Sequence, residues 1–158
     1  MTITLTINRK EKTFDIEPGE KLLDLLRGQG YMGVKKGCGS GDCGACSVLL
    51  NGRAVNSCLV FAAKADGCEI LTIEGLADGE KLHPIQAAFL AEGAVQCGYC
   101  TPGMVISTVD LLSRNPDPTE GEIRESLSGN LCRCTGYVKQ VRAVQRAAEL
   151  IKDGGSDV

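Results

Sequence analysis

Eight of the nine cysteines in this chain of 158 residues fall into two groups of four, and this pattern restricts the fold most strongly. An odd number of cysteines leaves at least one thiol unpaired, and thiols in the cytosol are kept reduced, so disulfides explain the pattern poorly. We therefore expect each group to bind metal. The groups are Cys38-x4-Cys43-x2-Cys46 with Cys58, and Cys97-x2-Cys100 with Cys132-x-Cys134.

Composition and charge exclude several classes of protein. The apolar fraction of 43% is too high for intrinsic disorder. The net charge of −3 has both signs interspersed along the chain, so no basic surface for nucleic acid is expected. No stretch approaches the roughly 20 apolar residues of a membrane span, and the N-terminus lacks the pattern of a signal peptide. We expect a cytoplasmic protein with no membrane span and no nucleic-acid partner.

The first half of the sequence predicts a small mixed sheet crossed by one helix. Residues 2–8 alternate between polar and apolar side chains, which predicts a strand and, with the polar turn after it, a hairpin. A leucine stripe over residues 22–26 predicts a helix, and further strands are expected at 47–50 and 69–73. Residues 37–44 are mostly Gly, Cys and small polar residues, which favours an irregular loop.

Helical patterns dominate the second half, after a polar connection at residues 77–81. Helices are expected from Pro84 and from Pro102, because proline is favoured in the first turn of a helix. A capping-box pattern begins a third helix at Thr119, and an apolar stripe runs over residues 138–151. Four helices predict a compact bundle.

The fold class is therefore α+β, with one domain at residues 1–76, a helical domain at 77–153 and a disordered tail at 154–158. Cys68 belongs to neither cysteine group and is interpreted as a small buried hydrophobic residue or an inert thiol. His83 is the only histidine, and we interpret it as the exposed start of a helix.

The first cysteine group has the spacing of plant-type [2Fe–2S] ferredoxins. Its ligands are expected to be Cys38, Cys43, Cys46 and Cys58. The glycines of the loop can adopt left-handed conformations, which would aim backbone N–H groups at the sulfur atoms. This motif predicts a [2Fe–2S] cluster in the first domain.

The second group supplies four thiolates from two short turns, each just before a helix. Helix N-terminal dipoles would face an anionic cluster there, so we expect lowered thiolate pKa values. Taken alone, the spacing allows a second iron–sulfur cluster or a tetrahedral zinc ion. The single residue between Cys132 and Cys134 is tighter than the two to four of zinc fingers, which weakens the zinc interpretation without removing it.

Three segments together resemble the signatures of the small iron–sulfur subunit of molybdenum hydroxylases, a family that includes xanthine dehydrogenases and aldehyde oxidoreductases. The resemblance extends over about residues 3 to 150. Asp42 departs from it, because the family more often has Glu or Gln there. The segments are Gly37-Cys38-Gly39-Ser40-Gly41-Asp42-Cys43-Gly44-Ala45-Cys46, Gln96-Cys97-Gly98-Tyr99-Cys100-Thr101-Pro102-Gly103 and Gly129-Asn130-Leu131-Cys132-Arg133-Cys134-Thr135-Gly136-Tyr137.

The resemblance implies a β-grasp, plant-type ferredoxin-like domain followed by a four-helix domain, each holding one [2Fe–2S] cluster. The ligands of the second cluster would be Cys97, Cys100, Cys132 and Cys134. The chain would relay electrons from molybdopterin on a large partner subunit to FAD on a medium one, or to another acceptor. It would have no catalytic residues or substrate site of its own. Gln96 and Cys134 would approach the pterin, and the complex would be a dimer of heterotrimers.

Two other functions remain open from the sequence. The chain could be a stand-alone soluble two-cluster ferredoxin that shuttles electrons between enzymes, or a zinc-stabilised interaction module. Among family members, the context of residues 93–96 is most similar to dehydrogenases of purines or related N-heterocycles. This resemblance implies a purine or another N-heterocycle as the substrate of the complex.

Overall fold

The computed structural model describes residues 1–154, and its first element is the expected hairpin. Strand β1 (Thr2–Ile7) pairs antiparallel with β2 (Lys10–Asp15). The two residues of the turn, Asn8 and Arg9, have φ values of +50° and +67°. Two residues with positive φ make a turn whose twist matches that of the flanking strands. The apolar residues of β1 alternate inward, as the sequence pattern predicts.

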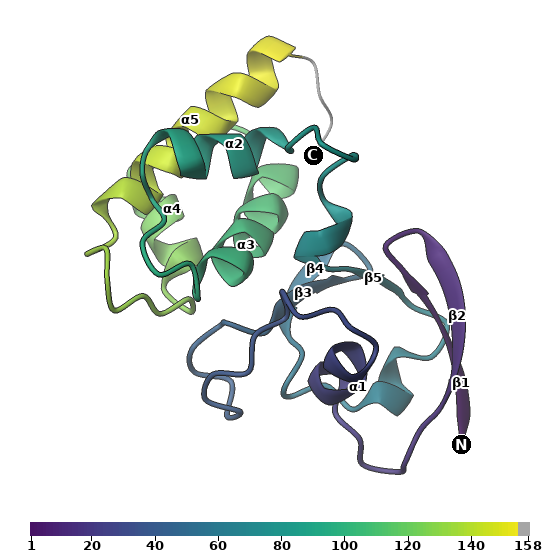
Figure 1. Cartoon of the computed structure of the whole chain (residues 1–158). Coiled ribbons are helices and arrows are strands. Elements are labelled where there is room, and N and C mark those ends of the chain that lie inside the picture. The colour runs from purple at the N-terminus through teal and green to yellow at the C-terminus, as the bar shows by residue number, and fades with distance from the viewer. Residues whose placement is uncertain (155–158) are drawn as a thin grey trace.

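The sheet has five strands in the order β2-β1-β5-β3-β4. Strand β5 (Glu69–Leu71) is parallel to β1 and antiparallel to β3 (Ser47–Leu50), which pairs antiparallel with β4 (Arg53–Asn56). Helix α1 (Leu22–Gly28) crosses the sheet (Figure 1). Short 3-10 helices lie at Ala62–Ala65 and Ile73–Gly75. This arrangement confirms the mixed sheet with one helix, and β4 adds a strand that the sequence pattern did not predict.

The helical half contains α2 (Pro84–Ala91), α3 (Thr101–Arg114), α4 (Glu120–Leu127) and α5 (Val138–Gly154). The capping box at Thr119 is confirmed, because its backbone N–H donates to Glu122 at 2.7 Å and its Oγ1 accepts from the Glu122 N–H at 3.3 Å. Helix α5 includes Gly154, which the sequence pattern assigned to the tail. The rest of the predicted tail lies outside the described residues. Along residues 1–154, no helix is long and apolar enough to cross a membrane.

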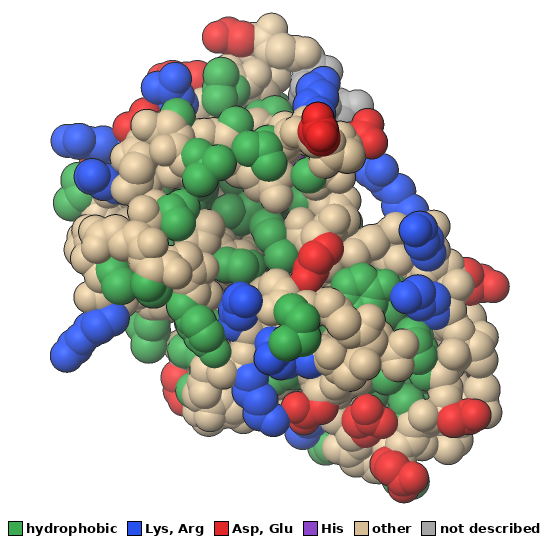
Figure 2. All heavy atoms as spheres, in the orientation of Figure 1, with side chains coloured by type: hydrophobic (Ala, Val, Ile, Leu, Met, Phe, Trp, Pro, Cys, Tyr) green, Lys and Arg blue, Asp and Glu red, His purple; other side chains and the backbone are tan. Residues whose placement is uncertain are grey.

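Two apolar cores meet at strand β3. Successive side chains of a strand point to opposite faces, and so Val48 joins the core under α1 while Leu49 joins the core of the helical half. Helix α3 packs against β3 on that second face. Figure 2 shows hydrophobic side chains gathered over the helical half and acidic side chains along the lower rim of the sheet half, away from the helices. The sheet is thus covered on both faces, by α1 and by α3.

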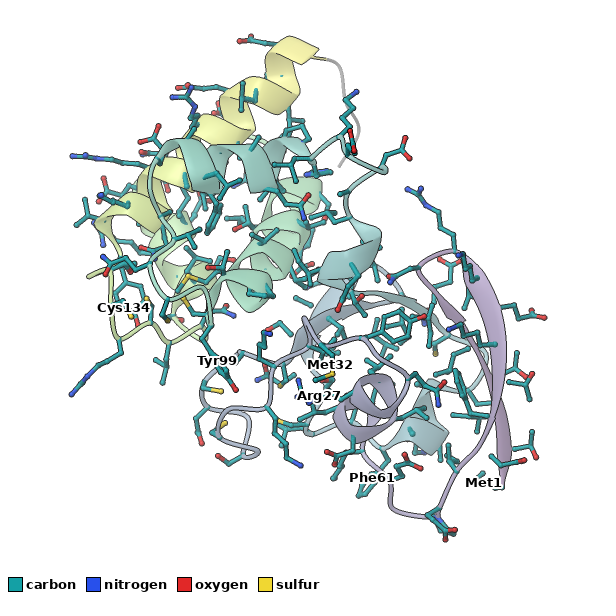
Figure 3. The ribbon with its side chains drawn as sticks, viewed as in Figure 1. Met1, Arg27, Met32, Phe61, Tyr99 and Cys134 are labelled. Atoms are coloured by element: carbon teal, nitrogen blue, oxygen red, sulfur yellow. The ribbon has the colours of Figure 1, made fainter. Side chains whose placement is uncertain are left out.

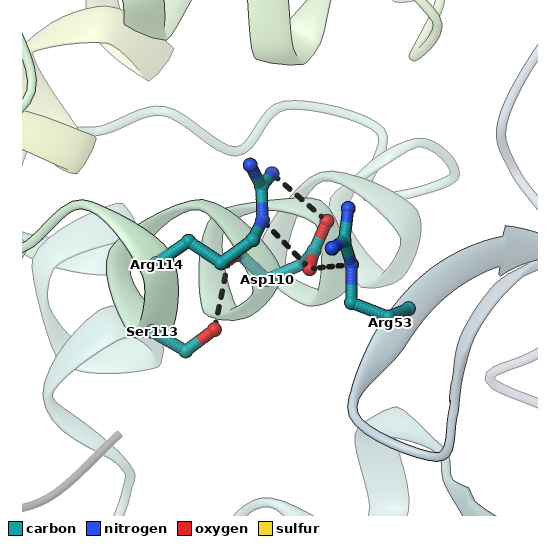
Figure 4. Close-up of polar contacts among 4 residues, drawn as sticks. All are labelled: Arg53, Asp110, Ser113 and Arg114. Carbon is teal, nitrogen blue, oxygen red and sulfur yellow. Dashed lines mark hydrogen bonds and ion pairs between the residues drawn. The ribbon is translucent and has the colours of Figure 1, made fainter.

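An ion-pair network also joins the two halves (Figure 4). The Asp110 carboxylate on α3 is nearly buried and lies 3.0 Å from Nε of Arg53 on β4. The same carboxylate accepts from Nε and Nη2 of Arg114 at 3.2 and 3.1 Å. A nearly buried carboxylate needs such partners, because a charge without them is costly to remove from water.

Helix α2 begins with a histidine cap. Nδ1 of His83 accepts from the Ile85 N–H at 3.2 Å, and the His83 N–H donates to Gln86 Oε1 at 3.0 Å. His83 is half-buried, and its burial lowers its pKa from the ordinary value of 6.5. The side chain expected to be merely exposed is therefore a structural acceptor. It can accept this hydrogen bond only when the imidazole is neutral.

This cap predicts a pH-dependent stability. A group with a lowered folded pKa stabilises the protein above its unfolded pKa, and loses that contribution as pH falls through about 6.5 toward the folded value. Asparagine can cap the helix through its side-chain amide and does not titrate. We therefore expect the free energy of unfolding of the His83→Asn variant to fall less than that of the wild type as the pH is lowered. The loss of the cap costs about 1 kcal/mol. Urea unfolding at pH 7.5 and 5.5 measures it, and parallel declines in both proteins would contradict the prediction.

Candidate metal centres

The loop of residues 37–46 arranges backbone N–H groups around cysteine sulfur atoms. The Cys38 sulfur accepts from the N–H groups of Ser40 and Asp42 at 3.4 and 3.3 Å, and the Cys43 sulfur accepts from the Cys38 N–H at 3.4 Å. A Cβ on Gly37 would lie 2.6 Å from the Cys43 sulfur, so any larger residue there would push that sulfur out of place. Amide donors that surround sulfur favour thiolates and an anionic group bound by them.

The fourth cysteine of this group comes from the segment after β4. Asn56 Nδ2 donates to the Gly41 carbonyl at 2.8 Å, and Ser57 Oγ donates to the Cys46 carbonyl at 2.7 Å. These bonds hold Cys58 beside the loop, where its thiol is within hydrogen-bonding reach of Cys46. The structure therefore brings the four cysteines of the first group together.

The thiols of the first group differ in acidity. Hydrogen bonds from Ser40, through its side chain and then its backbone, lower the pKa of Cys38 from 9.0 to about 6. Burial, followed by the neighbouring thiol of Cys46, raises the pKa of Cys58. Cys38 is exposed and Cys58 is buried. The exposed thiol of Cys38 is thus more readily deprotonated than the buried thiol of Cys58.

The second group assembles from the ends of the helices. Cys97 and Cys100 lie in the turn before α3, and Cys132 and Cys134 lie in the turn before α5. The thiols pair as Cys100 with Cys132 and Cys97 with Cys134, each pair within hydrogen-bonding reach. Among residues 1–154, no three His, Cys, Asp or Glu side chains are grouped as ligands of one metal ion.

The expectation of lowered pKa values at this second group is wrong for two thiols. Burial and then the thiol of Cys132 raise the pKa of Cys100 to about 12. The nearby thiol of Cys97 raises the pKa of Cys134. For Cys132, burial raises the pKa, but hydrogen bonds from Thr135 and from backbone groups outweigh it and lower the net value. Desolvation and neighbouring thiols therefore outweigh the helix dipoles at Cys100.

Hydrogen bonds join the two chain segments that carry the cysteine groups. The N–H of Leu131, the residue before Cys132, donates to the Cys43 carbonyl at 2.9 Å. The buried Asn130 amide donates to the Gly44 carbonyl at 3.1 Å. Gly103 at the start of α3 packs on that same Gly44 carbonyl. No role for Asn130 can be predicted from the sequence, because its partners belong to the other half of the chain.

Tyr99 makes a further bridge between the halves. Its hydroxyl donates to the Lys36 carbonyl at 2.7 Å. Figure 3 shows Tyr99 on the side of the helical half that faces the loop of residues 37–46, with Cys134 farther out on the surface. Gln96 and Cys134 are both exposed, so a partner can reach them. The Cys68 thiol has one hydrogen-bond partner among the described residues, the Asp66 carbonyl at 3.8 Å.

Comparison with known proteins agrees with this two-part arrangement. Residues 5–72 match the family described as "2Fe-2S iron-sulfur cluster binding domain", and residues 72–145 match the "[2Fe-2S] binding domain". Each half of the chain therefore corresponds to one type of [2Fe–2S]-binding domain. This assigns an iron–sulfur cluster, in place of zinc, to the second half.

Two relatives match this chain over nearly its whole length and nearly their own. The nicotinate dehydrogenase small FeS subunit of Eubacterium barkeri is 50% identical over 150 residues, which cover 94% of this chain and 96% of the relative. The xanthine dehydrogenase iron-sulfur-binding subunit of Escherichia coli O157:H7 is 50% identical over 146 residues, 91% of this chain and 92% of the relative.

A solved structure extends the likeness to three dimensions. A chain of quinoline 2-oxidoreductase from Pseudomonas putida 86 superimposes with a TM-score of 0.93 at 45% identity, over 99% of this chain and 98% of that one. Such agreement confirms the ferredoxin-like domain with a helical domain behind it. The chain belongs to the family of small iron–sulfur subunits of molybdenum hydroxylases.

Proposed function

We propose that this chain carries electrons from molybdopterin on a large partner subunit to FAD on a medium subunit, or to another acceptor. The observation that carries the proposal is the hydrogen bond from the Leu131 N–H to the Cys43 carbonyl. It links the backbone of a ligand in the first cysteine group to the residue before Cys132. When bound, the two [2Fe–2S] clusters supply one-electron oxidation and reduction.

Eight cysteines of this chain would bind the two clusters, and the packed fold would keep the clusters at a fixed separation. We propose Cys38, Cys43, Cys46 and Cys58 as ligands of the first cluster, because N–H donors and neighbouring thiols converge there. We propose Cys97, Cys100, Cys132 and Cys134 for the second, because their thiols pair. The sheet ends with β5 and the bundle begins at Pro84, which supports a domain boundary between residues 76 and 77.

The surface around the second centre supports a partner there. Cys134 and Gln96 are exposed, and the large side chains of Tyr99, Leu131 and Val138 around them are about half exposed. Exposed apolar side chains next to a centre that must pass electrons are typical of an interface. We propose that Gln96 and Cys134 face the pterin of the large subunit across it.

The remaining details of the complex are proposed from its relatives. Enzymes named for nicotinate, xanthine and quinoline all act on N-heterocycles, which supports a purine or another N-heterocycle as the substrate. We propose a cytoplasmic dimer of heterotrimers. A stand-alone ferredoxin is the other candidate, but the similar chains of matched length are named as subunits.

Purification of the native complex through a tag on this chain tests the proposal. We expect molybdenum and a flavin to copurify, with about four irons and matching sulfide per copy of this chain. Electron paramagnetic resonance of the dithionite-reduced sample should resolve two different half-spin signals. A monodisperse chain with both clusters but no partner would favour the ferredoxin instead. Zinc without sulfide would overturn both electron-transfer functions.

A further inference from the structure

The Gln140 side chain is an unusual polar group in the core of the helical half. It lies in the first turn of α5 with no exposed surface. Within residues 1–154 its Oε1 atom has no hydrogen-bond partner. A buried carbonyl oxygen without a hydrogen-bond partner lowers the stability of the fold. A compensating role is therefore expected from the contacts of the amide nitrogen.

The amide nitrogen of Gln140 links both turns of the second cysteine group. Nε2 lies 3.1 Å from the Ala94 carbonyl, shortly before Cys97, and 2.6 Å from Oγ1 of Thr135, just after Cys134. A backbone carbonyl can only accept, so the atom that faces Ala94 must be the nitrogen. Its two hydrogens are then used by Ala94 and Thr135. A contact with the Cys132 sulfur at 3.9 Å is secondary.

The contacts of Thr135 fix the direction of its own hydrogen bond. A hydroxyl has one hydrogen and two acceptor lone pairs. Oγ1 of Thr135 accepts from Gln140 at 2.6 Å and from the Tyr137 N–H at 3.4 Å, which uses both lone pairs. The remaining neighbour is the Cys132 sulfur at 3.0 Å. The hydroxyl proton therefore points at that sulfur.

We propose that Gln140 is a positioning residue for the second cluster: its amide orients the Thr135 hydroxyl to donate to the Cys132 sulfur. This proposal rests on the function proposed for the chain. A donor to a ligand sulfur stabilises the more negative, reduced cluster, so the Gln140–Thr135 pair raises its reduction potential. The first cluster lies outside the pair and keeps its potential.

The test compares midpoint potentials of both clusters in the assembled complex by titration followed with electron paramagnetic resonance. The variants are Gln140→Met, Thr135→Val and the two combined, with Thr135→Ser to restore the hydroxyl. We expect Thr135→Val to lower the reduced-to-oxidised ratio of the second cluster at fixed potential by about three- to tenfold. Tenfold corresponds to about 59 mV for one electron. The first cluster serves as the control in every sample.

The double variant carries the decisive comparison. If Gln140 acts through Thr135, Gln140→Met lowers the potential in the wild-type background and adds nothing to Thr135→Val. An unchanged potential in Gln140→Met, or an equal shift in both backgrounds, would overturn the proposal. Should Gln140→Met lose the cluster, Gln140→Leu replaces it. If Gln140→Met and Gln140→Leu both lose the second cluster, equal potentials of this cluster in Thr135→Ser and Thr135→Val would overturn the proposal.

Failure of the proposed function has a different signature. A wild-type complex without two [2Fe–2S] signals would overturn the electron-transfer function itself. Two normal signals with no effect of Gln140 would overturn only the role of this residue.

Discussion

Replacement of Cys132 by alanine is expected to lower the iron content of the chain from about four atoms to about two. The second cluster would lose a ligand, and its paramagnetic signal should disappear while the first remains. Turnover of the complex should fall to background, because the proposed path for electrons is broken. The helical half should also lose stability, since binding free energy at such sites contributes to folding. Iron and sulfide assays, spectroscopy and urea unfolding measure these effects.

The Cys68→Ala variant is the matched control for this experiment. Cys68 is half-buried and belongs to neither group, so the variant should keep both clusters and full turnover. Four irons in the Cys132→Ala protein, or a lost cluster in Cys68→Ala, would show that the proposed ligand set is wrong.

A methyl group at Gly103 is expected to destabilise the junction between the halves. Its Cβ would lie well inside van der Waals contact of the Gly44 carbonyl and 3.2 Å from the Asn130 amide nitrogen. Gly44 itself has φ +68° and cannot easily move, because Gly129 and Asn130 crowd it. Overpacking of this kind costs about 1–3 kcal/mol. We expect the Gly103→Ala variant to show a lower urea midpoint and slower electron exchange between the clusters.

Gly121→Ala is the control, because Gly121 is also a helical glycine. Its Cβ would have only Thr119 Oγ1 nearby, at 3.9 Å, on helix α4. Alanine improves helix propensity by up to about 1 kcal/mol, so this variant should be slightly more stable. A stable Gly103→Ala protein with normal electron exchange would mean that the contact with Gly44 does not hold the halves in place.

Local patterns in the sequence predicted most of the elements. The alternation in β1, the capping box at Thr119 and the prolines in the first turns of α2 and α3 each depend on neighbouring residues, and all three are confirmed. Strand β4 was missed because its short sequence, Arg-Ala-Val-Asn, lies at the sheet edge and has no inward apolar alternation. The histidine cap was missed because His is not among the preferred N-cap residues.

Features that depend on distant residues could not be predicted. The cysteines were found by spacing, but the raised pKa of Cys100 follows from burial against Cys132, which only the fold creates. Gly44 and Gly103 are ordinary flexible residues in the sequence, and their contact exists only when the halves pack. Gln140 left one signal: it shares a helical face with Val144 and Ala147, where a polar residue is unexpected.

The covering of the sheet by α3 has a consequence for anyone who wishes to use residues 1–76 as a minimal redox module. Excision would leave Leu49 and Leu71 of the sheet without the side chains that now pack on them. A bare apolar sheet face promotes self-association. Such a module would need polar replacements on that face before it could stay in solution alone.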